Sequence, residues 1–178
     1  MSGDAWISET TPYLAPREQG KPDAWTEEAG RRGRRGGQTL LQVGEVSAPA
    51  PVRAALNLGA DGQAVLRSRL ILLDGHPVEI ARSYYPVTVA RGTRLADPRK
   101  IPGGAVSLLH DLGFSSGVVL EDVSAGLADP EEREHLALPE GSAVLRLLRT
   151  TATAEGVPFE ASWMTMPADR HLTYRLGK

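Results

Sequence analysis

Apolar and polar residues alternate along residues 65–86, and the alternation breaks once, at the dipeptide Asp74-Gly75. A period of two is typical of β-strands and Asp-Gly is a strong hairpin signal, so this stretch predicts two antiparallel strands joined by a tight turn. One face of the predicted hairpin is apolar. The other face is polar and mostly cationic, and it carries Arg67, Arg69, Glu79, Ser83 and Tyr85.

The length of the turn decides which residues face each other across the hairpin. A two-residue loop would place Arg67 directly opposite Arg82, where like charges repel. A three-residue loop, residues 74–76, avoids this contact and keeps one face apolar, and it is the turn that we predict. It pairs Leu72 with Val78 and Leu70 with Ile80.

The same pattern occurs a second time later in the chain. Residues 64–67 (AVLR) recur as residues 143–146, residues 74–79 (DGHPVE) are echoed by residues 155–160 (EGVPFE), and residues 46–48 (VSA) recur at 123–125. These matches keep the same order, so they predict a duplicated unit of a helix followed by a hairpin. We expect the two hairpins to share one antiparallel sheet, because two copies are too few for a solenoid.

The remaining segments predict short helices and further strands. Asp23 is expected to cap a first short helix, and Asp129 with Pro130 marks the start of the last one. The helices are predicted over residues 24–29, 51–58, 105–112 and 129–138, and the further strands over 38–46, 118–125 and 172–176. No βαβ rhythm is present, so the fold class is α+β, an antiparallel sheet with flanking short helices. Residues 1–37 are expected to form an irregular lead-in with one short helix, and residues 38–178 the functional domain.

Composition excludes several classes of protein. The chain has 178 residues, of which 41% are hydrophobic and 24% charged, as in an ordinary globular domain with a real core. Its formal net charge of −2 argues against a body devoted to nucleic acid, and the absence of cysteine excludes disulfides and Cys-ligated metals. The chain contains neither an apolar run long enough for a membrane span nor a signal peptide. We therefore expect a cytoplasmic protein without membrane partners.

The sequence offers binding chemistry and no catalytic set. The four histidines are scattered, no nucleophile has a positioned base, and neither a metal nor another cofactor is predicted. The arginine-rich segment 31–37 is either a solvated connection or an arm that grips phosphates.

Three further features suit a small polar ligand with an anionic group. Arg67 and Arg69 point the same way from one strand and either bind a carboxylate or phosphate or form an exposed pair balanced by Glu79. Gly104 and Ser107 lie where a helix begins, which is either an anion site or a plain turn. Glu160 is either an acceptor for ligand hydroxyl or amine groups or a surface residue. A binding pocket is the better inference. Its candidate ligand contacts are Arg67, Arg69, Glu79, Ser83, Tyr85, Gly104, Ser107, Glu160 and Ser162.

These residues belong to a pattern that resembles a known family, the UTRA domain. The matching segments are Arg69, Asp74-Gly75-x-Pro77, Ser83-Tyr84-Tyr85-Pro86, Leu136-x-Leu138, Gly141-Ser142-Ala143-Val144-Leu145, Gly156-x-Pro158-x-Glu160-x-Ser162 and Asp169-Arg170. They cover about residues 38–176. The UTRA domain is the ligand-sensing half of HutC-branch, GntR-type bacterial transcription regulators. The resemblance implies a chorismate-lyase-like fold, a small effector, and a homodimer.

The resemblance also assigns roles to residues. It implies that Arg69 and Ser107 bind the anionic group of the effector and that Glu160 binds its polar groups. The family often has an arginine at position 71, a glutamate at 81 and a tyrosine near 166, where this chain has Ile71, Ala81 and Met166. These departures favour an effector less polar than a sugar phosphate. Tyr13 and Trp25 either cover the pocket mouth or serve ordinary packing.

We therefore predict an effector-binding module of a transcription regulator that is not an enzyme. The sequence contains no recognition-helix pattern, so DNA is expected as a partner only through a winged helix-turn-helix that this chain lacks. Two alternatives remain open: a lyase that acts on a cyclic carboxylate such as chorismate, and a sensor-only protein that pairs with full-length regulators.

Overall fold

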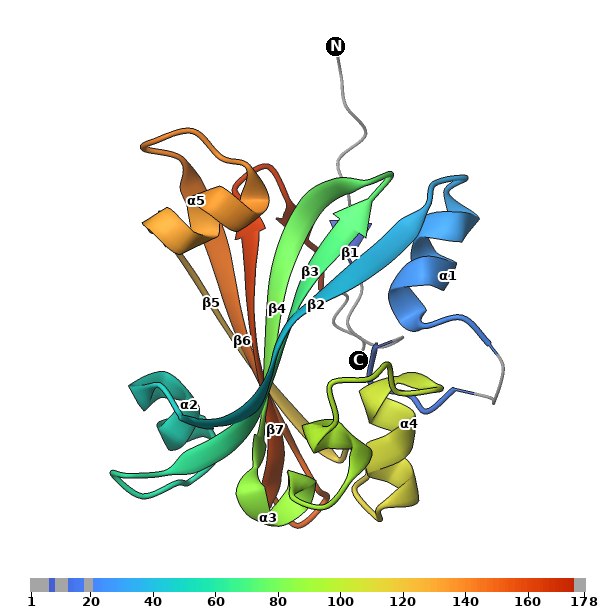
Figure 1. Cartoon of the computed structure of the whole chain (residues 1–178), viewed down its shortest axis with the longest axis vertical. Helices are drawn as coiled ribbons and strands as arrows, with labels where there is room; N and C mark the ends of the chain where they lie inside the picture. Colours follow the sequence, from blue (N-terminus) through green and yellow to red (C-terminus); the bar gives the residue numbers. More distant parts are fainter. Residues whose placement is uncertain (1–6, 9–12, 18–20, 175–178) are drawn as a thin grey trace.

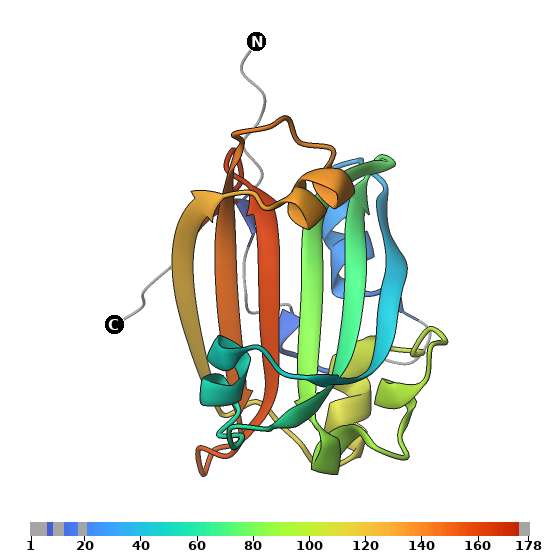
Figure 2. The same ribbon diagram turned by 60° about the vertical axis from the view of Figure 1, so that its left-hand side comes forward.

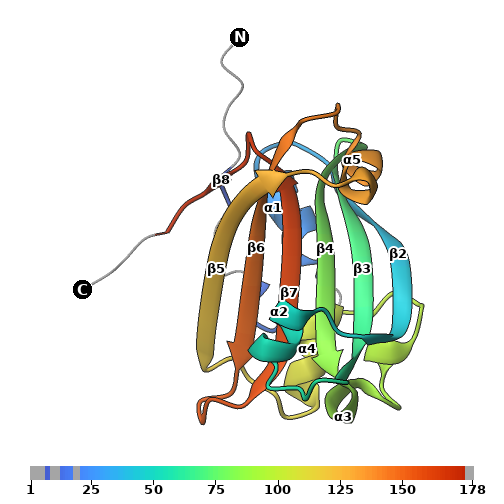
Figure 3. The same ribbon diagram turned by 90° about the vertical axis from the view of Figure 1, so that its left-hand side faces the viewer.

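A computed structural model of the chain describes residues 7–8, 13–17 and 21–174. Six strands form one antiparallel sheet in the order β2-β3-β4-β7-β6-β5 (Figures 2 and 3). They are β2 (Gly36–Ser47), β3 (Gln63–Leu73), β4 (His76–Pro86), β5 (Val118–Leu127), β6 (Ala143–Ala152) and β7 (Pro158–Pro167). The two-residue strands β1 (Ile7–Ser8) and β8 (His171–Leu172) pair with each other in parallel.

Short helices cover both faces of the sheet. They are α1 (Ala24–Arg31), α2 (Ala50–Ala55), α3 (Val87–Ala90), α4 (Gly104–Asp111) and α5 (Pro130–Leu136), with a 3-10 turn, η2, at Arg94–Ala96. Helices α2 and α5 lie on one face, and α1 and α4 lie on the other (Figure 1). The predicted α+β class with flanking short helices is confirmed. None of the helices in the described part of the chain has the length and hydropathy that a membrane crossing requires.

The two helix starts predicted from capping residues are correct, because side chains satisfy the free backbone donors. Asp23 Oδ1 accepts a 2.9 Å hydrogen bond from the backbone of Thr26. Asp129 and Glu132 form a reciprocal capping box at the start of α5. The predicted closing strand, in contrast, is reduced to His171–Leu172, and residues 175–178 lie outside the described part.

The predicted duplication is confirmed, and its halves meet where β4 pairs with β7. Each half is strand, helix, strand, strand. The equivalence of individual residues needs correction, because Ala64 pairs with Pro86 while Val144, not Ala143, pairs with Pro167. The echoed AVLR segments are therefore one residue out of step, which sends Arg67 and Arg146 to opposite faces of the sheet.

The upstream echo is also displaced. Ser47 ends β2 opposite Gln63, whereas Ser124 lies inside β5 opposite Arg146. The short VSA segments thus match in sequence without being equivalent in the fold.

The turn of the first hairpin has two residues, so the predicted three-residue loop is wrong. Asp74 and Gly75 have φ values of 51° and 84°, as a tight type I′ turn requires, and Leu73 pairs with His76. A bulge then follows, because Leu72 pairs with Pro77 and not with Val78. The bulge restores the predicted pairing of Leu70 with Ile80 and sets Arg67 opposite Ser83 rather than Arg82.

The arginine-rich segment 31–37 is tied to its neighbours by ion pairs. Arg34 Nε lies 2.7 Å from the Asp74 carboxylate, whose other oxygen accepts the backbone N–H of Arg35 at 2.8 Å. Arg31 and Arg32 pair with glutamates of α1. The segment therefore locks α1 and the start of β2 onto the hairpin turn.

Candidate functional site

A cavity of about 200 Å³ lies between the sheet and the elements that cover its α1/α4 face. Its floor is formed by the middle of β3, β4, β6 and β7, and its roof by residues 13–17, the start of α1 and the first turn of α4. A cavity of about 150 Å³ can hold benzene, so this one has room for a small organic molecule. Alternation along the strands places the polar faces of both hairpins on its floor, as the sequence predicts.

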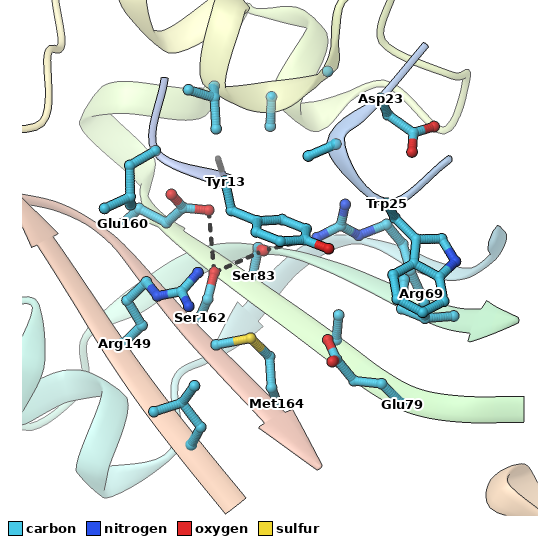
Figure 4. Close-up of a pocket in the computed structure, with 18 of the residues that line it drawn as sticks. Tyr13, Asp23, Trp25, Arg69, Glu79, Ser83, Arg149, Glu160, Ser162 and Met164 are labelled. Atoms are coloured by element: carbon cyan, nitrogen blue, oxygen red, sulfur yellow. Dashed lines mark hydrogen bonds between the residues drawn. The ribbon is translucent and has the colours of Figure 1, made fainter. Parts of the chain in front are cut away.

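A line of hydrogen bonds crosses the floor from Arg69 to Glu160 (Figure 4). Arg69 Nη2 donates to Ser83 Oγ at 3.2 Å, and Ser83 Oγ lies 3.0 Å from Ser162 Oγ. The Ser162 hydroxyl donates to Glu160 Oε1 at 3.2 Å, and the Tyr85 hydroxyl donates to the same oxygen at 3.0 Å. The line has a cation at one end and a carboxylate at the other.

Arg69 has fewer partners than its five donors could bind. Its one recorded partner among the described residues is the neutral hydroxyl of Ser83. Its Nε is buried and makes no hydrogen bond, and no described carboxylate lies within ion-pair distance of the guanidinium. A partly buried guanidinium normally binds a carboxylate or phosphate through two parallel hydrogen bonds. Arg69 therefore presents unused donors to the cavity.

The register shows a second arginine in an equivalent place. Arg69 lies opposite Ala81 and Arg149 lies opposite Ser162, and these partners stand equally far before Pro86 and Pro167. Arg149 differs in its contacts, because its Nε binds the Glu121 carboxylate of β5 at 2.6 Å and both side chains are largely buried. Arg149 is thus already neutralised inside the domain.

Two carboxylates are related in the same way. Glu79 and Glu160 stand equally far before the two prolines and both line the cavity. Burial raises the pKa of the Glu79 carboxyl above its ordinary value, against the opposing fields of Arg170 and other nearby arginines. Burial and then the proximity of Glu160 raise the pKa of Tyr85, so its hydroxyl remains a donor at neutral pH.

The lead-in supplies the roof. Figure 4 shows the Tyr13 ring lying across the floor, between Glu160 and Arg69. The Tyr13 hydroxyl binds the Glu28 carboxylate, and Trp25 Nε1 donates to the backbone oxygen of Leu72 at 2.8 Å. Tyr13 and Trp25 thus cover the cavity and also pack, which combines the two alternatives drawn from the sequence.

Seven of the nine residues proposed as ligand contacts line this cavity: Arg69, Glu79, Ser83, Tyr85, Gly104, Glu160 and Ser162. The backbone N–H of Gly104 is not free to bind an anion, because it donates a hydrogen bond to Ile101 O at 3.0 Å. What the helix start offers is glycine backbone without side chains at the cavity wall.

Arg67 and Ser107 lie elsewhere than expected. Arg67 is only 5% exposed, and its guanidinium donates to the backbone oxygens of Leu95, Asp97 and Arg99. It therefore holds the loop after α3 in place instead of facing a ligand. The Ser107 hydroxyl donates to Gly103 O at 2.9 Å and accepts the backbone N–H of Arg17 at 3.0 Å. It anchors the roof, outside the cavity lining.

Sequence reasoning missed two central residues of the floor, Arg149 and Met164. Arg149 could have been found by aligning the two copies on Pro86 and Pro167, with a one-residue difference between the hairpin loops. Met164 is the equivalent of Ser83 in the second copy and pairs with Ala81. The described residues contain no cluster of three or more potential metal ligands.

Comparison with protein families gives one match over most of the chain. The family model of the UTRA domain matches residues 31–171. An HTH-type transcriptional regulator from Streptomyces coelicolor is 35% identical over 135 residues, which cover 74% of this chain and 50% of that protein. One from Rhizobium meliloti is 30% identical over 142 residues, which cover 79% and 57%. The chain thus spans about half the length of these curated relatives.

Solved structures with the same fold include two isolated domains. The effector domain of PhnF from Mycobacterium smegmatis superposes with a TM-score of 0.72 at 17% identity, covering 86% of this chain and 94% of that one. The ligand-binding domain of a protein assigned to the GntR-family transcriptional regulators of Bordetella bronchiseptica gives a TM-score of 0.68 at 26% identity, with coverages of 80% and 92%.

Proposed function

The chain belongs to the UTRA domain family, the effector-binding domains of transcription regulators, and we propose that its central cavity binds a small organic anion. The observation that carries the proposal is Arg69. Among the described residues its guanidinium has a single hydroxyl partner and a buried Nε without a hydrogen bond, an arrangement that destabilises the domain without a ligand. A carboxylate or phosphate in the cavity would satisfy these donors.

The rest of the floor supports a ligand with both charge and hydrogen-bond donors. Glu160 already accepts two hydroxyl groups and has lone pairs left for an amine or hydroxyl of the ligand. The two central serines can donate or accept. Ile71, Ala81 and Met166 add apolar wall, which favours an anion with hydrocarbon parts over a sugar phosphate. No histidine among the described residues lines this floor to activate its serines as nucleophiles, so we propose binding without catalysis.

The roof suggests how effector binding changes the affinity of a DNA-binding domain for DNA. Tyr13 lies over the floor and Arg17 is hydrogen-bonded to α4, so a ligand that enters the cavity must contact or displace the lead-in. The lead-in precedes the domain along the chain, and the curated relatives are HTH-type regulators about twice as long as the matched part. We propose that the effector binds the two arrangements of the lead-in with different affinity and thereby changes the DNA affinity of an attached or partner DNA-binding domain.

Several finer assignments belong to the same proposal. We place the domain in the HutC branch of the GntR family and in the cytoplasm, with residues 38–178 as the ligand-binding domain and residues 1–37 as its lead-in. We also propose a homodimer. Strand β5 is an edge of the sheet, and its Leu120 and Leu127 are 67% and 69% exposed in the single chain. An exposed apolar edge strand is a natural pairing surface, and sedimentation of Leu120→Lys beside the wild type tests this.

The test of ligand binding is a thermal-shift screen with small organic carboxylates and phosphates. A ligand of the native state raises the melting temperature. Replacing Arg69 by Gln removes a charge-assisted contact and should weaken the best compound about 30-fold, since such bonds contribute about 2 kcal/mol.

The matched control is Arg82→Gln. Arg82 lies on β4 with its charge paired to Glu131 of α5, on the opposite face of the sheet. This variant should keep the full shift. A compound that stabilises Arg69→Gln as strongly as the wild type would place the anion elsewhere and end the proposal, and steady pyruvate release from chorismate would favour the lyase alternative.

A further inference from the structure

A second cavity, of about 130 Å³, lies between α4 and the ends of β6 and β7. It is lined mainly by apolar side chains, among them Leu109, Phe114 and Phe159. Leu109 and Phe159 are almost fully buried, and the two phenyl rings lie 5.5 Å apart, tilted by 41°. Protein interiors rarely leave voids much larger than a water molecule, and a void of this size and lining can take an aromatic ring.

One polar group in this cavity is left without a partner. Thr151 is 3% exposed, and its hydroxyl makes no hydrogen bond within the described part of the chain. A buried hydroxyl without a partner destabilises a protein, and nearly all such groups in native structures are paired. The hydroxyl therefore marks a place for an atom that can donate or accept a hydrogen bond.

The second cavity adjoins the first. Both are lined by Leu14, Val106 and Glu160, and Thr151 is the cross-strand neighbour of Glu160. Three consecutive hydrogen bonds of 3.2, 3.0 and 3.2 Å connect Arg69 Nη2 to Glu160 Oε1, so the guanidinium and the carboxylate lie less than about 10 Å apart. A single elongated molecule can thus meet Arg69 at one end, pass Glu160, and place its other end against Thr151.

We infer that the second cavity is a subsite for the effector's apolar end, an aromatic or similar ring that carries one hydrogen-bonding group. This inference rests on the proposed function, because it takes the anionic end to be held by Arg69. The effector class is then an elongated anion with a polar-substituted ring, long enough to reach from Arg69 past Glu160 to Thr151, and it excludes compact anions such as inorganic phosphate.

The test uses two series of synthetic probes, ω-phenylalkanoates and ω-(4-hydroxyphenyl)alkanoates with one to six methylenes, measured by calorimetry. We expect affinity to rise roughly four-fold per buried methylene until the ring reaches the second cavity. At that length the hydroxyl should add about five- to ten-fold by pairing with Thr151. Methyl NMR signals of Leu109 should then shift, and acetate should leave them unchanged.

Two variants separate this inference from the proposed function. Thr151→Val keeps the side-chain shape and should remove the advantage of the hydroxyl while leaving the phenyl series unaffected. Arg69→Gln should weaken both series equally.

If Arg69→Gln alone has an effect, the anion site stands and the second subsite is refuted. If Thr151→Val alone has an effect, the proposed anion site fails and a neutral-ring site remains. If no probe of either series binds better than acetate and the Leu109 signals stay fixed, the cavity holds water only and the inference is overturned.

Discussion

The two halves of the sheet carry the same pair of charged residues and use them differently. The first half brings Arg69 and Glu79 to the cavity, and the second half brings Arg149 and Glu160 to equivalent positions. Arg149 is ion-paired with Glu121 on the neighbouring strand, whereas the corresponding strand β2 presents Leu40 opposite Arg69. Within the described part of the chain, one copy of the repeat has a carboxylate partner for its arginine, and the other copy does not.

The difference shows where a duplicated fold can acquire a ligand-binding site. An arginine that is ion-paired within the domain contributes to stability and has few donors left for a ligand. An arginine without an internal carboxylate partner keeps unsatisfied donors, and a ligand in an adjoining cavity gains affinity by binding to them. Under the proposed function, the first half binds the anion, while the second half supplies the acceptor, Glu160, and structural support.

The largest expected effect concerns stability and comes from the second half. Arg149→Gln leaves the Glu121 carboxylate, whose side chain is 10% exposed, without its strong partner. Breaking such a pair costs about 3 kcal/mol. Arg69→Gln should change the free energy of unfolding by at most about 1 kcal/mol, because among the described residues it removes one hydrogen bond, to Ser83, and no ion pair. Urea unfolding of both variants measures the contrast, and equal losses would show that the two arginines are not differently used.

An intermediate effect concerns pH and the glutamate of the first half. Burial raises the pKa of Glu79 in the folded protein above its ordinary value of 4.5, so the folded state holds this proton to higher pH than the unfolded state does. Stability should therefore fall as the pH rises from about 4.5 through the folded-state pKa. Glu79→Gln should remove that fall in pH-dependent melting curves. Glu160→Gln is the comparison, and an identical change in both variants would contradict a specific role of Glu79.

Much of the fold was readable from local patterns. The period of two and the Asp-Gly turn predicted the first hairpin, and the repeat predicted a shared sheet. The alternation of side chains along each strand placed Arg69, Ser83 and Glu160 on one face of it. These features depend only on residues close in sequence. The bulge at Val78 did not follow from local patterns, because the preference of Asp74-Gly75 for a two-residue turn had to be reconciled with a register set by the whole sheet.

The roles of individual arginines depended on contacts far apart in sequence. Arg67 and Arg69 share a strand face, and only the chain that packs above them separates the two. The loop after α3 brings three carbonyl oxygens to Arg67, while a cavity faces Arg69. Arg149 was missed because a chance AVLR match aligned Arg67 with Arg146, one residue out of register. The loop that packs over Arg67 resolves the first case, and strand pairing resolves the second.

The smallest expected effect lies at the boundary between the halves. Ser83 links Arg69 to Ser162, and its equivalent in the second half is Met164, which makes no such link. Ser83→Ala should cost about 1 kcal/mol of stability, the net value of a typical hydrogen bond. It should also weaken anion binding a few-fold, since Arg69 loses the one group that orients it. Met164→Leu, a change of similar volume, should leave anion affinity unchanged in the same calorimetric assay. If both substitutions reduced affinity alike, the floor would act through its shape, and the orientation of Arg69 by Ser83 would have no part in recognition.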